Sequence, residues 1–194
     1  MSKSSLDQLP SLTVRDREEW RQWLSENHET SSGIWLIYHK KNSKQTGIQY
    51  EEAVEEALSF GWIDSKVNTL DEERYMQVFT PRKPGSTWSQ LNKQRVRNLI
   101  KRGMMKSSGM EKVESAKKDG SWNFLDDIDN LVVPNDLMEA LNDNPHARES
   151  YEGYSDSIKK QVLYWIASAK RVETRERRIE KVVKKAENNE KPFD

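Results

Sequence analysis

The chain has 194 residues, of which 34% are hydrophobic and 33% charged, and its 32 Lys+Arg balance its 32 Asp+Glu. This length allows one large domain, or one medium domain and a small bundle, and seven Trp, six Tyr and four Phe supply apolar surface that disordered chains lack. The zero net charge gives no overall attraction to nucleic acid or to an anionic membrane, and the absence of Cys excludes disulfides, thiolate zinc sites and a cysteine nucleophile.

The two ends of the chain lack strong periodicity. We expect flexible segments at residues 1–12, which are rich in Ser, and at residues 189–194. Neither the first ten residues nor any later stretch contains an apolar run long enough for a signal peptide or a membrane span. The expected location is therefore the cytoplasm.

Between residues 13 and 131 helical and strand patterns alternate. Asp16 with Glu19 resembles a capping box that opens a helix ending near Asn27, and the apolar run at 33–40 is typical of a strand. Further patterns predict helices at 50–61, about 88–102 and 109–119, and a hairpin of strands 63–68 and 74–80. These elements predict an α+β domain with helices around a small, largely antiparallel sheet.

From about Val132 the pattern becomes purely helical. Amphipathic stripes at 158–169 and 179–186 predict two long helices, and shorter helices are separated by turns at Pro134, Pro145 and Gly153. Arg175 lies on the packing side of the last helix, and we interpret it as an anchor that pairs with a carboxylate. We therefore expect a small helical C-terminal bundle at 132–188.

No motif with an established chemical mechanism is present. The chain has no GxGxxG, Walker-type, HExxH, GxSxG or EF-hand sequence, and its three histidines are far apart, so we predict neither a cofactor nor a metal site. Four glutamates share one predicted helix: Glu51, Glu52, Glu55 and Glu56. Without a Glu-x-x-His element they lack the ligands of a di-iron site, and we interpret them as a solvated outer face.

The stretch from residue 60 to residue 92 mixes indoles with polar and charged side chains. The candidate ligand-binding residues are Trp62, Asp64, Arg82, Lys83, Ser86, Trp88 and Asn92. Arg82 and Lys83 beside two indoles suit stacking and charge-assisted hydrogen bonds to an anion.

Structural roles are the alternative for two of these residues. Asp64 and Arg82 could form an ion pair that fixes the register of the hairpin. Asn92 falls within a predicted apolar stripe, where a buried amide needs a partner and could tie the preceding loop to the helix. The stripe consists of Trp88, Leu91, Val96, Leu99 and Ile100.

Lys93, Arg97 and Lys101 recur at every fourth position of the same predicted helix. Such a basic ridge could contact phosphates, or it could dock on the acidic loop at 121–130 or face water. A nucleic-acid-associated protein is therefore the alternative function. A hydrolase is the third, because Asp64 with a nearby serine, Ser86 or Ser89, lacks an evident base.

Several separated motifs occur in one order along the chain: residues 61–65, 79–84, 86–89 with Asn92, 99–104, and 169–175 continuing to 178–179. In these motifs, from about Arg17 to Lys185, the chain resembles the YdeI/OmpD-associated family, the bacteriocin-protection proteins. The resemblance implies a link to envelope stress, antimicrobial-peptide resistance and a porin, and it implies no reaction and no catalytic residues. The family is sometimes described as periplasmic, whereas this sequence shows no export signal.

Together these observations favour a binding or stress-protection module over an enzyme. We expect a pocket for a small anionic ligand, or for a partner's carboxylate, at the seven candidate residues, and a link to antimicrobial-peptide or bacteriocin resistance. The identity of the ligand, the partner and the oligomeric state stay open.

Overall fold

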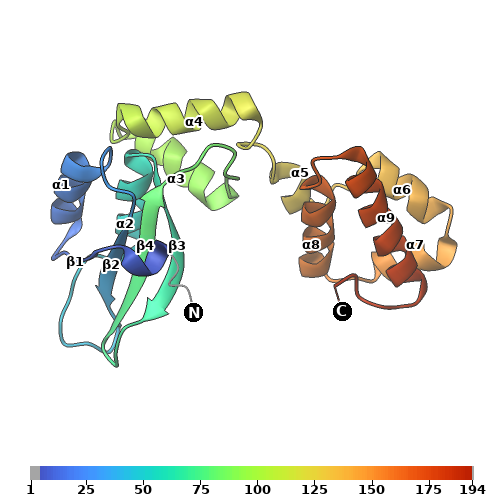
Figure 1. Cartoon of the computed structure of the whole chain (residues 1–194), viewed down its shortest axis with the longest axis horizontal. Coiled ribbons are helices and arrows are strands. Elements are labelled where there is room, and N and C mark those ends of the chain that lie inside the picture. Colours follow the sequence, from blue (N-terminus) through green and yellow to red (C-terminus); the bar gives the residue numbers. More distant parts are fainter. Residues whose placement is uncertain (1–4, 194) are drawn as a thin grey trace. The chain divides into compact units, whose positions relative to one another are not determined.

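A computed structural model describes residues 5–193. The chain divides into two compact units, Met1–Trp122 and Asn123–Asp194 (Figure 1), and each unit has its own hydrophobic core. Among residues 5–193, no helix combines the length and the apolar character that crossing a membrane requires.

The first unit contains a four-stranded sheet with strand order β1-β2-β4-β3. Its strands are β1 (Ser11–Thr13), β2 (Ile34–His39), β3 (Trp62–Thr69) and β4 (Arg74–Pro81). The short β1 is parallel to β2, and the other two pairings are antiparallel. Its helices are α1 (Arg17–Asn27), α2 (Tyr50–Ser59), α3 (Gln90–Lys101) and α4 (Ser107–Asp119). This confirms the predicted α+β class with a largely antiparallel sheet.

The helix boundaries follow from local capping. Asp16 accepts a hydrogen bond from the backbone N of Glu19 at 2.9 Å and so caps α1. Gly61 follows α2 and Gly120 follows α4, with φ angles of 76° and 83°, a left-handed conformation that glycine adopts without a Cβ penalty. Only one of the two hydrogen bonds of the predicted capping box is formed, the one from the backbone N of Glu19 to Asp16. The Glu19 carboxylate accepts from the backbone N of Arg15 and not from that of Asp16.

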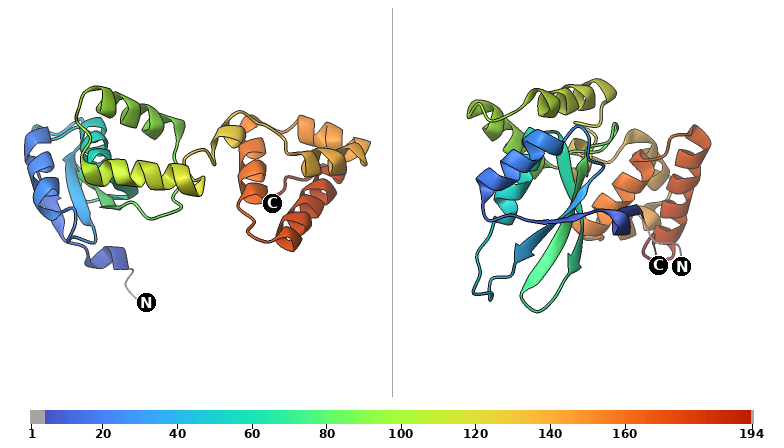
Figure 2. Two further views of the ribbon diagram at one scale, coloured as in Figure 1. Left: turned by 90° about the horizontal axis from the view of Figure 1, so that it is seen from above. Right: turned by 60° about the vertical axis from the view of Figure 1, so that its left-hand side comes forward.

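The core of the first unit lies between the sheet and the helices. One face of the sheet packs against α1 and α2. The sheet contributes Ile34, Leu36 and Phe79, and the helices contribute Trp20, Leu24, Val54 and Leu58. Figures 1 and 2 show the helices gathered around the sheet, while the β3–β4 hairpin extends beyond them.

The N-terminal segment has regular structure that the sequence did not predict. Residues 5–8 form a 3-10 helix, and β1 follows within the segment expected to be flexible at 1–12; residues 1–4 lie outside the described part. Trp35 alternates with Leu36 and so points to the other face of the sheet, where its Nε1 donates to the carbonyl oxygen of Leu6 at 2.8 Å. A three-residue strand shows no periodicity of its own, and it forms because β2 offers it hydrogen-bonding partners.

The second unit is entirely helical. It comprises α5 (Asp126–Asp129), α6 (Asn135–Asn142), α7 (Pro145–Glu152), α8 (Asp156–Ala167) and α9 (Val172–Glu187). Helix α9 contacts α6, α7 and α8, and its Val182 is fully buried in the shared core. The division falls after Trp122, earlier than the predicted boundary near Val132, because Phe124, Leu125 and Ile128 pack in the second core.

The segment after α9, expected to be flexible at 189–194, makes contacts within this unit. Tyr154 donates its hydroxyl to the carbonyl oxygen of Glu190 at 2.7 Å, and the rings of Phe193 and Trp165 meet edge to face at 5.5 Å. Residue 194 lies outside the described part. Aromatic contacts of this kind give a polar segment a position that its composition does not predict.

Arg175 is the anchor that the sequence predicted. Its Nε and Nη2 donate to the Asp136 carboxylate at 2.5 and 2.9 Å, and its Nη1 donates to the carbonyl oxygen of Ile166 at 3.4 Å. These hydrogen bonds hold the pKa of Asp136 below its ordinary value. The pair joins the start of α6 to the start of α9.

The interpretation of the four α2 glutamates as a solvated face was wrong for one of them. Glu56 is fully buried and accepts hydrogen bonds from the Nε of Arg17, at 2.6 Å, and from Arg21. Glu55 beside it is 3.0 Å from Arg17. This cluster fastens α1 to α2, a role that the helical pattern of one element cannot reveal.

Candidate functional site

The structure distributes the seven candidate residues over three places in the first unit. Trp62 lies in the core, 1% exposed, where its ring meets Trp23 edge to face and its Nε1 donates to the carbonyl oxygen of His28 at 3.1 Å. Both its ring and its N–H are therefore occupied. Trp62 supports the unit and does not line a hollow.

Asp64 and Asn92 belong to a second, polar cluster. One oxygen of Asp64 accepts from the hydroxyl of Tyr50 at 3.1 Å and from the side-chain amide of Gln77 at 2.6 Å. Asn92 accepts from the guanidinium of Arg95 at 2.9 Å, and that guanidinium lies 5.9 Å from the centre of the Tyr50 ring. Burial and the neighbouring Asp64 raise the pKa of Tyr50.

Asn92 is half-buried, and its backbone N donates to the Ser89 hydroxyl that caps α3. The predicted apolar stripe of this helix is only partly buried, because Leu91 and Ile100 are 60% and 45% exposed. The side chain of Asn92 therefore bonds to Arg95 on its own helix, whereas the structural role expected from the sequence was a tie between the preceding loop and the helix. Asp64 is also held by neutral partners, and it forms no ion pair with Arg82 within the described residues.

Arg82 combines burial with a lack of charged partners. Its side chain is 5% exposed, its guanidinium carbon lies 3.6 Å from the centre of the Trp88 ring, and its Nη2 donates to the carbonyl oxygen of Thr87 at 2.6 Å. Its Nε is buried and has no hydrogen-bond partner within the described residues. Burial lowers the pKa of Arg82 to about 10, and the charge of Asp64 partly opposes this shift.

A hollow of about 230 Å³ lies beside this guanidinium. Its wall on one side is the segment after β4, which contributes Arg82, Lys83, Pro84, Gly85, Ser86 and Trp88. The other wall is α4 and the residues after it, which contribute Glu111, Lys112, Ser115, Ala116, Asp119 and Ser121. Four of the seven candidates therefore line one hollow, which we call the Arg82 hollow.

Charged groups of both signs surround the Arg82 hollow. Lys83 is exposed and Lys112 is half-buried, so two ammonium groups stand near the buried guanidinium. The Asp119 carboxylate accepts from the backbone N of Gly85 at 3.2 Å and from that of Ser121 at 2.9 Å. The side chain and the backbone N of Ser121 and, to a smaller extent, the backbone N of Gly85 hold the pKa of Asp119 below its usual value. The two backbone hydrogen bonds fasten the loop after β4 to the end of α4.

The residues that sequence reasoning missed are those of the α4 wall. Lys112, Ser115 and Asp119 recur at helical spacing, so they share one face of α4. This spacing was readable from the sequence. The sequence did not show that this face of α4 lies opposite the loop after β4, because the position of α4 depends on its packing against α2.

That packing needs glycine at one position of α4. A Cβ on Gly109 would lie 2.3 Å from the carbonyl oxygen of Ser59, at the end of α2. Gly61, which follows α2, is similarly close to the carbonyl oxygen of Ser108, at 2.9 Å from an added Cβ. The two helices therefore approach closely where α4 begins, and the rest of α4 forms the wall of the hollow.

The predicted basic ridge on α3 does not form as one surface. Lys93 is 1% exposed, and its ammonium lies 5.6 Å from the centre of the Trp122 ring, whereas Arg97 and Lys101 are exposed. Because each helical residue advances by about 100°, Lys101 lies roughly 80° around the helix from Lys93. The spacing that suggested a ridge therefore turns its first member into the core.

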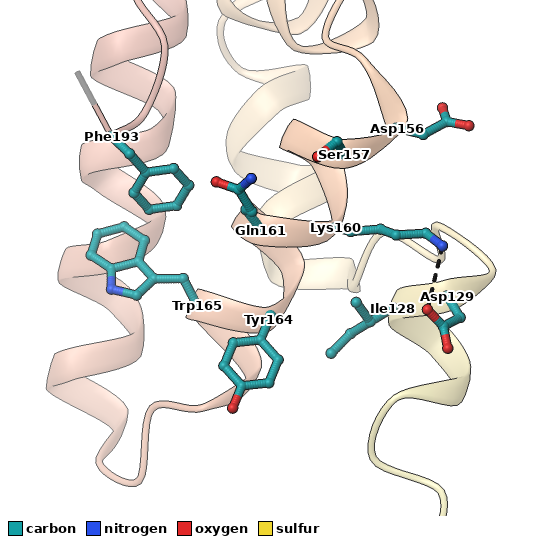
Figure 3. Close-up of a pocket in the computed structure, with 9 residues that line it drawn as sticks. All are labelled: Ile128, Asp129, Asp156, Ser157, Lys160, Gln161, Tyr164, Trp165 and Phe193. Carbon is teal, nitrogen blue, oxygen red and sulfur yellow. Dashed lines mark hydrogen bonds and ion pairs between the residues drawn. The ribbon is translucent and has the colours of Figure 1, made fainter. Parts of the chain in front are cut away.

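A second hollow, of about 720 Å³, lies in the second unit (Figure 3). Its apolar lining consists of Ile128, Tyr164, Trp165 and Phe193, and its polar lining of Asp129, Asp156, Ser157, Lys160 and Gln161. In Figure 3 Lys160 reaches toward Asp129, with 3.3 Å between the two groups, and the rings of Trp165 and Phe193 stand close together. We call this the aromatic groove. Sequence reasoning assigned no site here, because Phe193 belonged to a segment expected to be flexible.

Within residues 5–193, no group of three or more His, Asp or Glu side chains is placed to hold a metal ion. Neither of the two hollows contains a histidine among its lining residues.

Two sequence families match the chain. Residues 12–112, just over half of the chain, match a family described as a domain of unknown function (DUF8412), and residues 130–189 match one described as Bacteriocin-protection, YdeI or OmpD-Associated. The second match is shorter than the resemblance predicted from Arg17 to Lys185, since the motifs at 61–104 lie in the first. No curated protein and no solved structure matches the chain. The chain therefore belongs to the DUF8412 family, and its second unit contains a domain, residues 130–189, that matches the YdeI or OmpD-associated, bacteriocin-protection family.

Proposed function

We propose that this protein is a non-catalytic, cytoplasmic binding module linked to antimicrobial-peptide or bacteriocin resistance, and that its first unit binds a small anion, or a partner's carboxylate, in the Arg82 hollow. The buried guanidinium of Arg82 carries this proposal. It is 5% exposed and has no ion-pair partner among the described residues.

A cation out of water needs compensation, and the protein supplies only part of it. A buried charge is costly unless it is paired and hydrogen-bonded. Stacking on Trp88 and one hydrogen bond to Thr87 account for one face and one nitrogen of Arg82, while its Nε–H stays unbonded. An anion in the hollow would supply both an opposite charge and an acceptor.

The lining of the hollow favours binding over acid–base chemistry. Of the two carboxylates in its lining, Asp119 already accepts two backbone N–H groups and Glu111 is exposed. The lining contains no histidine. Asp64, the acid of the hydrolase alternative, is bonded to Tyr50 and Gln77 and does not line this hollow. The nucleic-acid alternative has lost its main support, because Lys93 is buried.

Thermal denaturation with inorganic phosphate and with acetate tests the proposal. Each anion should raise the melting temperature of the full chain, because a ligand that binds the native state stabilises it by mass action. In Arg82→Met, which keeps the apolar part of the side chain, the apparent affinity should fall about thirtyfold or more. Lys112→Ala, at a half-buried position, should weaken binding to a smaller extent without threatening the fold.

Potassium chloride at matched ionic strength is the control for screening, and Lys101→Ala is the control for an exposed lysine outside the hollow. The control variant should respond to phosphate as the natural chain does. The proposal is wrong if Arg82→Met and Lys112→Ala both keep the full response, or if chloride reproduces it.

A further inference from the structure

The aromatic groove of the second unit exposes large apolar side chains that a folded domain ordinarily buries. Tyr164 is 46% exposed and Phe193 is 45% exposed. They lie on either side of Trp165, which meets Phe193 edge to face, while Tyr164 meets Phe124 in the same way at 5.7 Å. Two separate ring pairs therefore support the aromatic lining, and Figure 3 draws three of these rings, those of Tyr164, Trp165 and Phe193.

Exposed aromatic side chains gathered in one hollow are typical of recognition sites. The volume of about 720 Å³ is enough for bulky side chains of a partner. Gln161 and Ser157 line the same groove on α8 and can hydrogen-bond to a backbone or side-chain amide.

The charges around the groove indicate the sign of the partner. Lys160 is the single cation among the lining residues, and Asp129 is 3.3 Å from it, so that pair is neutral. Asp156 also lines the groove; it is exposed and forms no ion pair within the described residues. The net charge of this edge is therefore negative.

Two cationic side chains lie near the Trp165 ring but outside the lining of the groove. The guanidinium of Arg178 and the ammonium of Lys181 lie 5.2 and 5.5 Å from the centre of the Trp165 ring, but neither lines the groove. A partner with a positive charge near Asp156 would be attracted there, and an anionic partner would meet an uncompensated carboxylate.

We propose that the aromatic groove binds a basic peptide segment of a partner protein. A bulky apolar side chain of the peptide lies against Tyr164, Trp165 and Phe193, and a Lys or Arg side chain pairs with Asp156. This is the helix-in-groove or extended-peptide mode of recognition, in which ring contacts supply affinity and charges supply specificity. The proposal does not depend on the Arg82 hollow, which lies in the other unit.

The test uses the full chain and two fluorescein-labelled synthetic peptides, observed by fluorescence anisotropy. One peptide contains Leu and Lys at helical spacing, and the other has Glu in place of every Lys. The Lys peptide should bind and the Glu peptide should not. Affinity for the Lys peptide should fall about tenfold in Tyr164→Ala and in Phe193→Ala, since truncated aromatic anchors dominate binding.

Charge variants separate the two parts of the proposal. Asp156→Asn should weaken binding severalfold and reduce its dependence on salt. Matched controls outside the groove are Asp143→Asn and Met138→Ala, an exposed acid and an exposed apolar residue of the same unit, and these should bind as the natural chain does.

Three outcomes overturn the proposal. One is equal binding of the Glu peptide, and another is full affinity for the Lys peptide in Phe193→Ala. The third is a concentration-dependent dimer, seen by analytical ultracentrifugation, that is lost in Tyr164→Ala. That result would assign the groove to a second copy of the chain.

Discussion

Buried polar groups in the first unit differ in whether they find a partner. Glu56 is fully buried and accepts hydrogen bonds from two arginines of α1. These ion pairs offset the free-energy cost of removing its charge from water. Arg82 is almost as buried but lacks an ion-pair partner among the described residues. At the scale of single residues, the distinction between a structural charge and a candidate binding charge therefore rests on the partners and not on burial alone.

Tyr38 gives a test of this distinction with a neutral group. Its side chain is 2% exposed, its ring stacks on Tyr75 at 4.9 Å, and its hydroxyl has no hydrogen-bond partner among the described residues. A buried hydroxyl without a partner costs about 1 kcal/mol or more. Tyr38→Phe should therefore raise the free energy of unfolding by about 1 kcal/mol, as measured by urea denaturation.

Tyr50→Phe is the matched control. Its hydroxyl donates to Asp64 at 3.1 Å, so its removal should lower the free energy of unfolding by about 1 kcal/mol. Changes of opposite sign in the free energy of unfolding would show that the presence of a hydrogen-bond partner decides the effect of removing the hydroxyl. A loss of stability in Tyr38→Phe would mean that its hydroxyl has a partner after all.

At the scale of elements, the close approach of α4 to α2 positions one wall of the Arg82 hollow. Gly109→Ala tests it. In an isolated helix this change would be favourable by about 1 kcal/mol, but the added Cβ would lie 2.3 Å from the carbonyl oxygen of Ser59. That oxygen accepts a hydrogen bond from the backbone N of Lys106 at 3.0 Å, so it cannot move without loss. We expect a net loss of about 1–3 kcal/mol.

Gly103→Ala is the control for this prediction. Its φ angle is 66° and an added Cβ would meet nothing within 4 Å, so only the left-handed conformation costs energy, about 1 kcal/mol. Both variants are measured by urea denaturation. A Gly109→Ala protein as stable as the natural chain would refute the claim that the two backbones touch.

The elements also show what a sequence can and cannot predict. Helix α2 was readable because its apolar positions recur at helical spacing, and the β3–β4 hairpin was readable from its flanking turn. Strand β1 was missed because three residues carry no period. The four hollow residues near Arg82 were found because they are close in the sequence, whereas the α4 wall was missed because no local pattern reports which helix faces the loop.

At the scale of the whole molecule, the two units have separate cores that share no residue. The division into two units agrees with the two family matches, which leave residues 113–129 between them. The sequence predicted two parts from the change of pattern near Val132. The predicted boundary lies too late in the chain because the acidic composition of the short helix α5 is typical of a loop. In the structure Ile128 of this helix packs in the second core.

Separate cores predict that a change in one unit leaves the other unaffected, and Asp136 in the second unit offers a change that depends on pH. Its folded-state pKa lies below the ordinary value because of Arg175. The stabilisation is therefore complete above the unfolded-state pKa of about 3.9 and is lost as the pH falls through the lower folded-state pKa. Asp136→Asn should be less stable than the natural chain at about pH 6, and the difference should shrink below about pH 4.

Hydrogen exchange of the full chain, followed by mass spectrometry, measures both parts of this prediction. At about pH 6, Asp136→Asn should lose protection in peptides from residues 123–193 and keep it in peptides from residues 5–122, because local stability sets the rate of opening. Asp143→Asn removes an exposed acid of the same unit that forms no ion pair among the described residues, so its protection should stay unchanged. Equal loss of protection in both units would mean that they unfold together, and the second unit would then have to be treated as part of one cooperative structure.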